Sequence, residues 1–316
     1  GVLVRGSGVT IRNLNIESMS SRGIDLYQNS HINLINNRII NCTTGIKSYG
    51  SQFLQITDNS ISNCGDGFYI HSSGNVIMSG NEAVECNNYG ICLFGTSNCT
   101  MTDNVMVGNR YNFYCSITYY NSIDTSNTVD GKPVYYLIKE NGLTVDSSSN
   151  AGVLYLIECR NIKVKDLILE NNGAGILLWD TKDSLVENVQ VSNNECGIYM
   201  GSSDNNRLFN NVINCNKYGI YFSSNSNYIE VYNNSFIDNS TYHIYVYNAS
   251  GNIFNKPVPV GGNYWSGWTS PDNNFDGFVD IPYKISNYYF DYLPWVKNRG
   301  WLDSSAPVTT IISNGT

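Results

Sequence analysis

Short runs of alternating apolar and polar residues recur along the chain, separated by corners rich in glycine and asparagine. Runs such as Phe68-Tyr69-Ile70 and Ile198-Tyr199-Met200 each follow a glycine, and every second residue is apolar. A period of two predicts β-strands with one buried face, and no segment sustains the 3.6-residue period of an α-helix. The pattern therefore predicts an all-β protein.

The runs belong to a repeat of about 22 residues. The stretch "NNRIINCTTGI" begins at Asn36, and "DNSISNCGDGF" begins at Asp58. One slot of the repeat holds a glycine followed by an apolar residue; its members are Gly1, Gly23, Gly45, Gly67, Gly90, Gly152, Gly175, Gly197 and Gly219, with Asn112 taking the slot once and His243 ending it. A second slot holds Asn15, Asn37, Asn59, Asn81, Asn104, Asn188, Asn211 and Asn234. A fixed period of this length is the signature of a solenoid.

Three short strands per repeat predict a right-handed parallel β-helix. Leucine-rich repeats share the length, but their leucine framework is absent. Equivalent residues should stack about 4.8 Å apart, with isoleucine and valine inside, and asparagine should hydrogen-bond its equivalent one coil away. About a dozen slots at that spacing predict a single rod roughly 50–60 Å long. Ile24, Ile46, Phe68, Ile91 and Phe113 should form one buried column, joined later by Ile176, Ile198, Ile220 and Ile244.

The same register divides the chain. Residues 1–250 should form the β-helix, with irregular, decorated coils at about 116–150, where the glycine and asparagine series are interrupted. Residues 251–300 should form a small C-terminal cap. Residues 301–316 are polar and predict a linker towards a further module.

Composition narrows the classes of partner. The 18 Lys and Arg against 26 Asp and Glu give a formal net charge of −8, which argues against nucleic-acid binding. No apolar run is long enough to span a membrane. Nine cysteines, an odd number, show no zinc-ligand spacing. Acceptor sites for N-glycosylation occur at Asn41, Asn98, Asn233, Asn239, Asn248 and Asn314.

Two motifs stand apart from the plain repeat: "IDTSNTVDGKPVYYLI" (Ile123–Ile138) and "GNYWSGWTSPDNNFDGFVDIPYKI" (Gly262–Ile285). They resemble motifs of a known family, the NosD-like (CASH-type) parallel β-helices common in secreted and surface-layer proteins of archaea. The first is similar to a segment that these proteins carry between blocks of coils, and the second resembles their closing motif. Gly267-Trp268 and Phe278-Val279 depart from the usual Asp-Tyr and Ile-Gly of that motif. The resemblance implies an extracellular or cell-surface protein. The family includes copper-delivery factors, sugar-active enzymes and envelope scaffolds, so it leaves the function open.

The closing motif also predicts a structural calcium site. The run "DNNFDGFVD" places Asp272, Asn274, Asp276 and Asp280 at positions 1, 3, 5 and 9 of an EF-hand-like loop, and Phe278 would add its carbonyl at position 7. Tyr283 replaces the bidentate glutamate at position 12, so Asp280 or the more distant Asp291 would have to supply that ligand. The alternative is a metal-free turn, since Asp, Asn and Gly are common turn formers. No organic cofactor is expected.

The strand after each glycine should point one series of residues outward. A predicted interaction face on this series consists of Tyr69, Cys92, Tyr114, Tyr199, Tyr221 and Tyr245. The alternative is a solvated aromatic ladder that only steadies the sheet. Cys92 is expected to be exposed. Cys42, Cys64 and Cys86 should stack in one column, either as buried thiols or with one disulfide.

Catalytic and copper chemistry find little support in this pattern. Asp25 and Lys47 on the outer face form no acid pair, and Asp180 with Asp183 should lie in a solvated turn. His31, His71 and His243 fall in different coils or slots.

The predicted function is therefore non-enzymatic. We expect an extracellular structural scaffold of a cell-surface layer, sheath or filament that self-associates or binds other surface proteins through its outer faces. The alternatives are a module that binds or processes carbohydrate, and an accessory protein for copper delivery.

Overall fold

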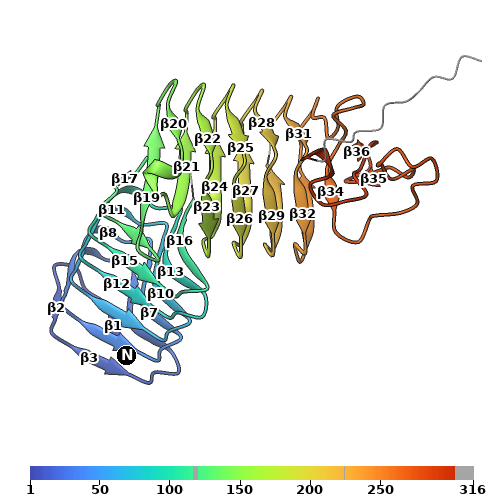
Figure 1. The fold of residues 1–316 in the computed structure, drawn as a ribbon. Coiled ribbons are helices and arrows are strands. Elements are labelled where there is room, and N and C mark those ends of the chain that lie inside the picture. The colour runs from blue at the N-terminus through green and yellow to red at the C-terminus, as the bar shows by residue number, and fades with distance from the viewer. Residues whose placement is uncertain (117–119, 224, 303–316) are drawn as a thin grey trace, which may run out of the picture.

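Coils of three short strands build the two arms of the protein, which are stacks that meet at an angle. The computed structural model describes residues 1–116, 120–223 and 225–302. Figure 1 shows a first arm, from Val2 to Val129, and a second arm, from Lys132 to Val246, with the cap beyond it. The predicted all-β, right-handed parallel β-helix is confirmed. The predicted single rod is wrong, because the stack bends where the asparagine and glycine series are interrupted.

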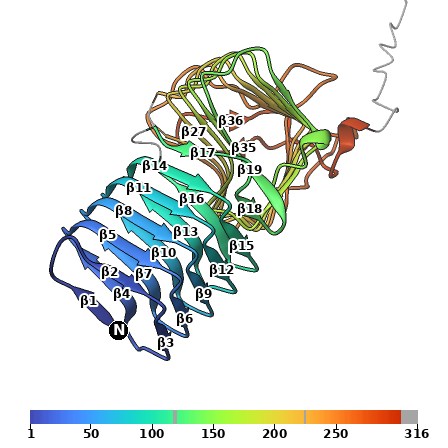
Figure 2. The same ribbon diagram turned by 90° about the vertical axis from the view of Figure 1, so that its left-hand side faces the viewer.

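Three parallel sheets line the first arm, and Figure 2 shows their strands in successive rows. Sheet A contains β1 (Val2–Val4), β4 (Arg22–Tyr27), β7 (Thr44–Tyr49), β10 (Asp66–His71), β13 (Tyr89–Phe94) and β16 (Tyr111–Cys115). Sheet B contains β2 (Thr10–Arg12), β5 (Ser30–Ile35), β8 (Gln52–Thr57), β11 (Gly74–Ser79), β14 (Ser97–Thr102) and β17 (Ser122–Ile123). Sheet C contains β3 (Asn15–Glu17), β6 (Arg38–Ile40), β9 (Ser60–Ser62), β12 (Glu82–Val84), β15 (Val105–Val107) and β18 (Thr128–Val129).

The second arm repeats the plan with its own three sheets. Sheet D contains β19 (Lys132–Ile138), β21 (Val153–Ile157), β24 (Ala174–Trp179), β27 (Cys196–Gly201), β30 (Tyr218–Phe222) and β33 (Tyr242–Val246). Sheet E contains β20 (Thr144–Val145), β22 (Lys163–Lys165), β25 (Leu185–Glu187), β28 (Arg207–Phe209) and β31 (Glu230–Tyr232). Sheet F contains β23 (Ile168–Glu170), β26 (Gln190–Ser192), β29 (Val212–Asn214), β32 (Ser235–Ile237) and β34 (Tyr264–Trp265). A short 3₁₀ turn, η1 (Ser147–Ser149), decorates the first of these coils.

The bend, which we call the elbow, is made by one antiparallel step. β18 pairs with β19 antiparallel, whereas every other pair along the two arms is parallel. Sheet C of the first arm thus continues into sheet D of the second. The open end of sheet A meets the outer side of sheet D: Gly173 N donates to Phe113 O at 2.9 Å, and Asn112 N donates to Asn171 O at 2.6 Å. These backbone bonds fix one arm against the other.

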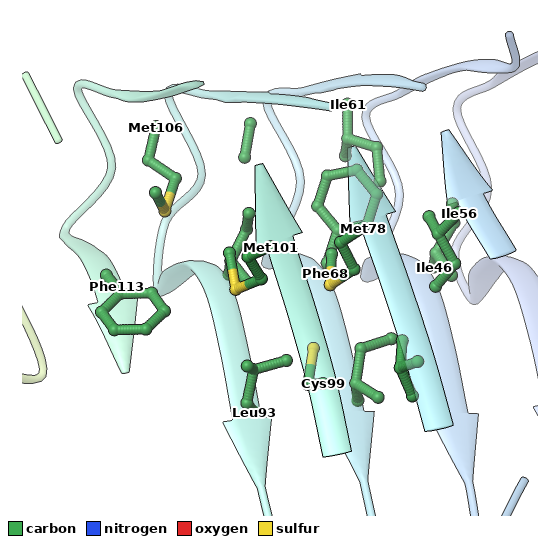
Figure 3. Close-up of a cluster of buried hydrophobic side chains, with 14 of the residues drawn as sticks. Ile46, Ile56, Ile61, Phe68, Met78, Leu93, Cys99, Met101, Met106 and Phe113 are labelled. Carbon is green, nitrogen blue, oxygen red and sulfur yellow. The ribbon is translucent and has the colours of Figure 1, made fainter. Parts of the chain in front are cut away.

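Bulky apolar side chains fill both arms, as the alternation predicts. Figure 3 shows part of the first core, where Phe68 and Met78 lie in one coil, Met101 in the next coil and Phe113 one coil farther along. The predicted inward column is fully buried from Ile24 to Phe113. Its continuation is not as predicted: Ile176, Ile198, Ile220 and Ile244 form a separate buried column on sheet D, because the elbow separates the two stacks.

Buried asparagines join successive coils in ladders, again as predicted. Asn37 Nδ2 donates to Asn59 Oδ1 at 2.9 Å, and the same bond links Asn59 to Asn81 at 3.0 Å and Asn81 to Asn104 at 2.9 Å. Asn127 ends this ladder at 2.7 Å from Asn104. The second arm has ladders of its own; their members are Asn194, Asn216 and Asn239 in one, and Asn211, Asn234 and Asn263 in another.

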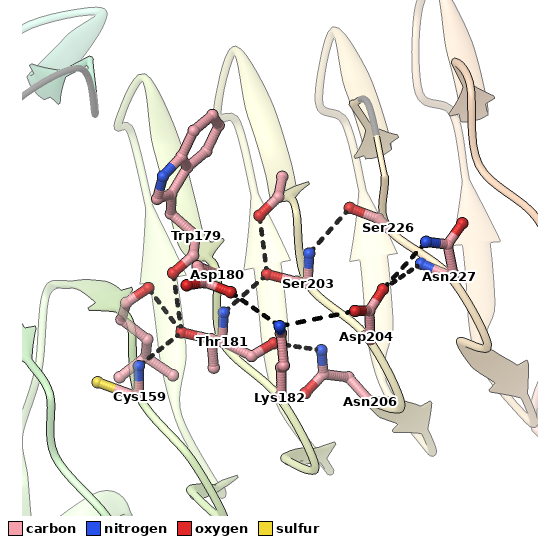
Figure 4. A network of polar contacts seen from close by, with 12 residues as sticks. Cys159, Trp179, Asp180, Thr181, Lys182, Ser203, Asp204, Asn206, Ser226 and Asn227 are labelled. Carbon is pink, nitrogen blue, oxygen red and sulfur yellow. Dashed lines mark hydrogen bonds and ion pairs between the residues drawn. The ribbon is translucent and has the colours of Figure 1, made fainter.

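At another corner of the second arm, serine and threonine hydroxyl groups link successive coils in place of asparagine side chains (Figure 4). Thr181 N donates to Ser203 Oγ, and Ser203 N donates to Ser226 Oγ. Beside them Lys182 Nζ lies 3.1 Å from Asp180 and 3.8 Å from Asp204. Asp180 and Asp183 both have positive φ at corners, which agrees with the expectation that they are turn residues.

The cap closes the far end of the second arm with aromatic rings. Trp265 stacks between Phe236, at 4.5 Å, and Tyr283, at 4.0 Å between ring centroids. The buried carboxylate of Asp291 accepts hydrogen bonds from Trp265 Nε1 and from the backbone N–H of Asn263. Burial raises the pKa of Asp291 to about 7. The remaining elements of the cap are β35 (Tyr283–Lys284), β36 (Phe290–Asp291) and the 3₁₀ turn η2 (Gly300–Leu302).

The buried column of sheet D gives a direct test of the fold. We expect Ile198→Asp to lower the free energy of unfolding by about 3–5 kcal/mol, because it places an unpaired carboxylate in a sealed core. Ile77→Asp is the matched control at a half-exposed site of β11, and it should cost less than about 1 kcal/mol. Denaturant unfolding measures both, and equal losses would contradict the predicted difference between the two sites.

Candidate functional site

The inner side of the elbow holds a cavity of about 320 Å³ between the two arms. β16 of the first arm contributes Tyr114, and Ser116 follows it. The outer side of sheet D contributes the opposite wall, whose lining residues are Gly173, Ala174, Leu177, Trp179, Glu195, Cys196, Tyr199, Tyr218 and Tyr221. This size and this largely aromatic lining are typical of a small-ligand site. We call this cavity the elbow pocket.

The tyrosines of sheet D form a ladder that leads into the elbow pocket. Tyr199 and Tyr221 stack at 5.5 Å between centroids with their planes 9° apart, and Tyr245 follows Tyr221 at 4.8 Å. Rings stacked in this way turn their edges and hydroxyl groups outward. Tyr218 stands at 89° to Tyr221 in an edge-to-face contact. The pocket wall therefore combines ring edges, phenolic hydroxyl groups and differently oriented rings.

One carboxylate lies at the border of the elbow pocket and is held by both arms. Tyr89 of β13 donates its hydroxyl hydrogen to Glu195 Oε2, across 106 residues of sequence. Lys217 Nζ lies 3.0 Å from Glu195 Oε1. Burial, followed by the hydrogen bond to Glu195, raises the pKa of Tyr89 well above its usual value. Tyr89 thus stays a neutral donor, and Glu195 stays in place as an acceptor.

A second, polar cavity of about 700 Å³ lies on the other side of Lys217. Asn171, Asn193, Ser240 and Thr241 line it from the second arm, and Arg110 and Tyr111 line it from the first. The guanidinium of Arg110 lies 5.2 Å from the centroid of the Tyr111 ring. We call the two cavities together the elbow groove: an aromatic half and a hydrogen-bonding half, with Glu195 and Lys217 between them.

Family models of known proteins match the coils of both arms. The family described as "Right handed beta helix region" matches residues 1–154, and the family "Periplasmic copper-binding protein (NosD)" matches residues 137–270. Together the two matches span residues 1–270, and they support a NosD-like parallel β-helix repeat protein. This bears out the NosD-like part of the resemblance drawn from the two sequence motifs; its archaeal surface-layer part stays a prediction. No curated protein sequence matches the chain.

Solved β-helix structures resemble the protein only distantly. The A-module of the mannuronan C-5 epimerase AlgE6 from Azotobacter vinelandii has 15% identity and a TM-score of 0.35, with 77% of this chain and 81% of that chain covered. The periplasmic alginate epimerase AlgG has 12% identity and a TM-score of 0.31, with 78% of this chain and 76% of that chain covered. The Dettilon tailspike protein has 11% identity and a TM-score of 0.31, with 83% of this chain and 60% of that chain covered. Likenesses this low support no inference about function.

The predicted interaction face is divided by the elbow. Tyr114, Tyr199 and Tyr221 line the elbow pocket of the NosD-like protein, and Tyr245 continues their ladder. Tyr69 lies farther away on β10 of the first arm, in register with Cys92. The prediction that Cys92 is exposed is wrong: its side chain points outward, but it is only 2% exposed. It lies between Tyr69 and Tyr114 in the column, and these larger side chains, together with Tyr89, cover it.

Several residues of the elbow groove were not predicted from the sequence. Tyr89 is the first residue of β13, and Glu195 and Lys217 lie at the corners just before β27 and β30, so none of the three occupies the outward position from which the face was read. Trp179 is an outward residue at the end of β24 and could have been read from the alternation. No sequence signal showed that Tyr89 would meet Glu195, because their contact depends on the antiparallel step at the elbow.

The cysteines lie in the described part of the chain and are all unpaired. Cys42, Cys64 and Cys86 are buried in one column, and Cys42 N donates to Cys64 Sγ at 3.4 Å. Thiols here occupy the slot that asparagines hold in the second arm. The one exposed thiol is Cys215, at a corner with φ of 56° beside the polar cavity.

The histidines do not converge. His31 stacks on Phe53 of sheet B, His71 lies in a ring stack on sheet A, and His243 packs against Trp265 at the cap. Residues 1–116, 120–223 and 225–302 contain no group of three His, Cys, Asp or Glu side chains that could hold a metal ion. In the same ranges no helix is long and apolar enough to cross a bilayer.

The predicted glycosylation sites differ in their surroundings. Asn41, Asn98 and Asn248 are exposed, whereas Asn233 and Asn239 are half-buried. Asn239 Nδ2 donates to Ile213 O within a ladder, so a glycan at this nitrogen would break the ladder. Asn314 lies outside the described residues.

The predicted calcium loop forms a compact turn in the cap. Asp272 accepts hydrogen bonds from the N–H groups of Asp276 and Gly277, and Asp276 accepts one from Phe278 N. Asn273 Nδ2 donates a hydrogen bond to Asp280 Oδ2, and Asn274 Nδ2 donates one to Asp276 Oδ2. Their oxygens are the donor type that Ca²⁺ prefers. Asp291 is buried against Trp265 and Asn263 instead of facing the loop.

Calcium binding by this loop remains a prediction; Asn273 occupies only the Oδ2 atom of Asp280. We expect EGTA to lower the melting temperature of the protein and excess calcium to restore it. Asp276→Ala should remove the calcium-dependent increment, whereas Glu85→Ala, at an exposed corner of the first arm, should keep it. Differential scanning fluorimetry measures both variants, and a melting curve indifferent to calcium and chelator would rule the site out.

Proposed function

We propose that the NosD-like protein is an exported, non-catalytic β-helix that binds carbohydrate in the elbow groove. The observation that carries the proposal is the pairing of an aromatic pocket with a polar cavity on either side of Glu195 and Lys217. Sugars have apolar C–H faces and a rim of hydroxyl groups. They therefore suit a site in which rings and hydrogen-bonding groups lie side by side.

The polar groups of the elbow groove are placed in advance. Glu195 is held from two sides, so it can accept a hydrogen bond from a sugar hydroxyl without first being ordered. The amides of Asn171 and Asn193 and the hydroxyls of Ser240 and Thr241 offer donors and acceptors on the polar side. Such fixed groups reduce the entropy lost on binding.

Among the described residues, the elbow groove has too few carboxyl groups for glycoside hydrolysis, so we favour binding alone. Glycosidases of the usual kind need two carboxyl groups flanking one bond. Glu195 is the one acid among the residues that line the two cavities, and it is engaged by Tyr89 and Lys217. The groove thus contains a recognition carboxylate without the acid–base pair.

The scaffold hypothesis used the same tyrosines as a packing face. Tyr199 and Tyr221 lie in the inner angle of the elbow, against Tyr114 of the other arm. A narrow sugar chain can enter a pocket of this size, whereas the broad face of another β-helix would be kept away by the first arm (Figure 1). For this reason we favour carbohydrate over self-association as the use of these rings.

Titration calorimetry with oligosaccharides tests the proposal. The probes are neutral and acidic trimers, cellotriose and trigalacturonate. We expect Tyr199→Ala combined with Tyr221→Ala to weaken binding about 30-fold, because each lost ring contact is worth roughly 1 kcal/mol. The matched control combines Tyr288→Ala with Tyr292→Ala, two exposed tyrosines of the cap, and it should bind the oligosaccharide as tightly as the unaltered protein does. Equal affinities of the two double variants would contradict the proposal.

A further inference from the structure

A second row of aromatic rings runs along the first arm and ends at the elbow groove. It occupies the last outward position of successive strands of sheet A, and its members are Tyr27, Tyr49, His71 and Phe94. The centroids are 5.5, 4.9 and 5.0 Å apart, and the planes of neighbouring rings differ by at most 12°. We call this row the aromatic track.

The aromatic track is open to solvent and joins the elbow pocket without a break. Tyr27, Tyr49 and Phe94 are 59%, 40% and 44% exposed. Phe94 stacks at 6.4 Å on Tyr114, which is itself a wall of the pocket. Beyond the pocket the ladder of Tyr199, Tyr221 and Tyr245 continues on the second arm. A row of exposed large rings that repeats over four coils is unusual for a surface without a partner.

Hydrogen-bonding side chains accompany the aromatic track. The neighbouring outward column of sheet A holds Asp25, Lys47 and Tyr69, one per coil. Tyr69 of this column stacks on His71 of the aromatic track at 6.2 Å between ring centroids, so the two columns form one strip. Each coil from Asp25 to Tyr69 thus presents a ring edge with a charged or hydroxyl group beside it, repeated about every 4.8 Å along the arm.

We infer that the aromatic track is an extension of the elbow groove that carries a polysaccharide chain, so that the ligand is a polymer. This rests on the proposed function. A repeat of roughly one coil is comparable to the length of one sugar unit, and an extended glycan could present a hydroxyl group to every coil. A stable contact with a second copy of the protein would bury on the order of 1,000 Å² or more. A strip one ring and one polar side chain wide does not offer that area.

The test compares short and long ligands of the same chemistry. The probes are cellotriose with soluble mixed-linkage β-glucan, and trigalacturonate with polygalacturonate. The track variant combines Tyr27→Ala with Tyr49→Ala, two rings of the track that do not contact the wall of the elbow pocket. The matched control combines Phe53→Ala with Ile77→Ala, two half-exposed apolar residues on sheet B of the same arm.

We expect the track variant to bind the polymer about tenfold more weakly than the unaltered protein and to bind the trimer equally well. The control variant should match the unaltered protein with both ligands. If the polymer affinity is unchanged in the track variant, the inference is overturned while the trimer still reports on the elbow pocket. Binding of neither trimer nor polymer would overturn the proposed function and the inference with it. A smaller particle in size-exclusion chromatography, with polymer binding unaffected, would identify the track as a contact between copies and would also overturn the inference.

Discussion

The stacking of each coil on the next through buried asparagine amides is the interaction on which the rest of the structure depends. An unpaired buried polar group costs about 1–3 kcal/mol, and Asn81 Oδ1, one coil away, accepts from both the backbone N–H and the side-chain amide of Asn59. This requirement fixes the register, and the register places every outward side chain directly above its equivalent. Ring ladders such as Tyr199 and Tyr221 follow from that alignment. The surface chemistry of the arms is thus a consequence of the interior.

The elbow lies where this constraint ends. Asn127 is the last member of the first ladder, and the chain then reverses through the antiparallel pair of β18 and β19 before a new stack begins. The bend brings the outer side of sheet D against the end of sheet A. Tyr89 and Glu195 can meet only because of this geometry. A straight stack of the same coils would carry two separate aromatic ladders and no pocket between them.

How much could be read from the sequence depends on whether a residue belongs to the repeat. The columns of Ile46 and Ile198 followed from period two and the 22-residue spacing, because both signals persist through each arm. The series Tyr27, Tyr49, His71 and Phe94 carried the same spacing and was available to the same reasoning. The burial of Cys92 could not be predicted from the repeat, because it depends on the size of the side chains around it. The elbow was marked only as an interruption of the register, and an interruption does not specify a direction.

The central claim is that the two arms together form one carbohydrate site. A crystal structure of the protein soaked with a trisaccharide that binds in solution tests it most directly. The account predicts a sugar ring between Tyr114 of the first arm and Tyr199 or Tyr221 of the second, with a hydroxyl group hydrogen-bonded to Glu195. Sugar bound on one arm alone, away from the elbow, or an elbow pocket left empty while sugar occupies another surface, would contradict it.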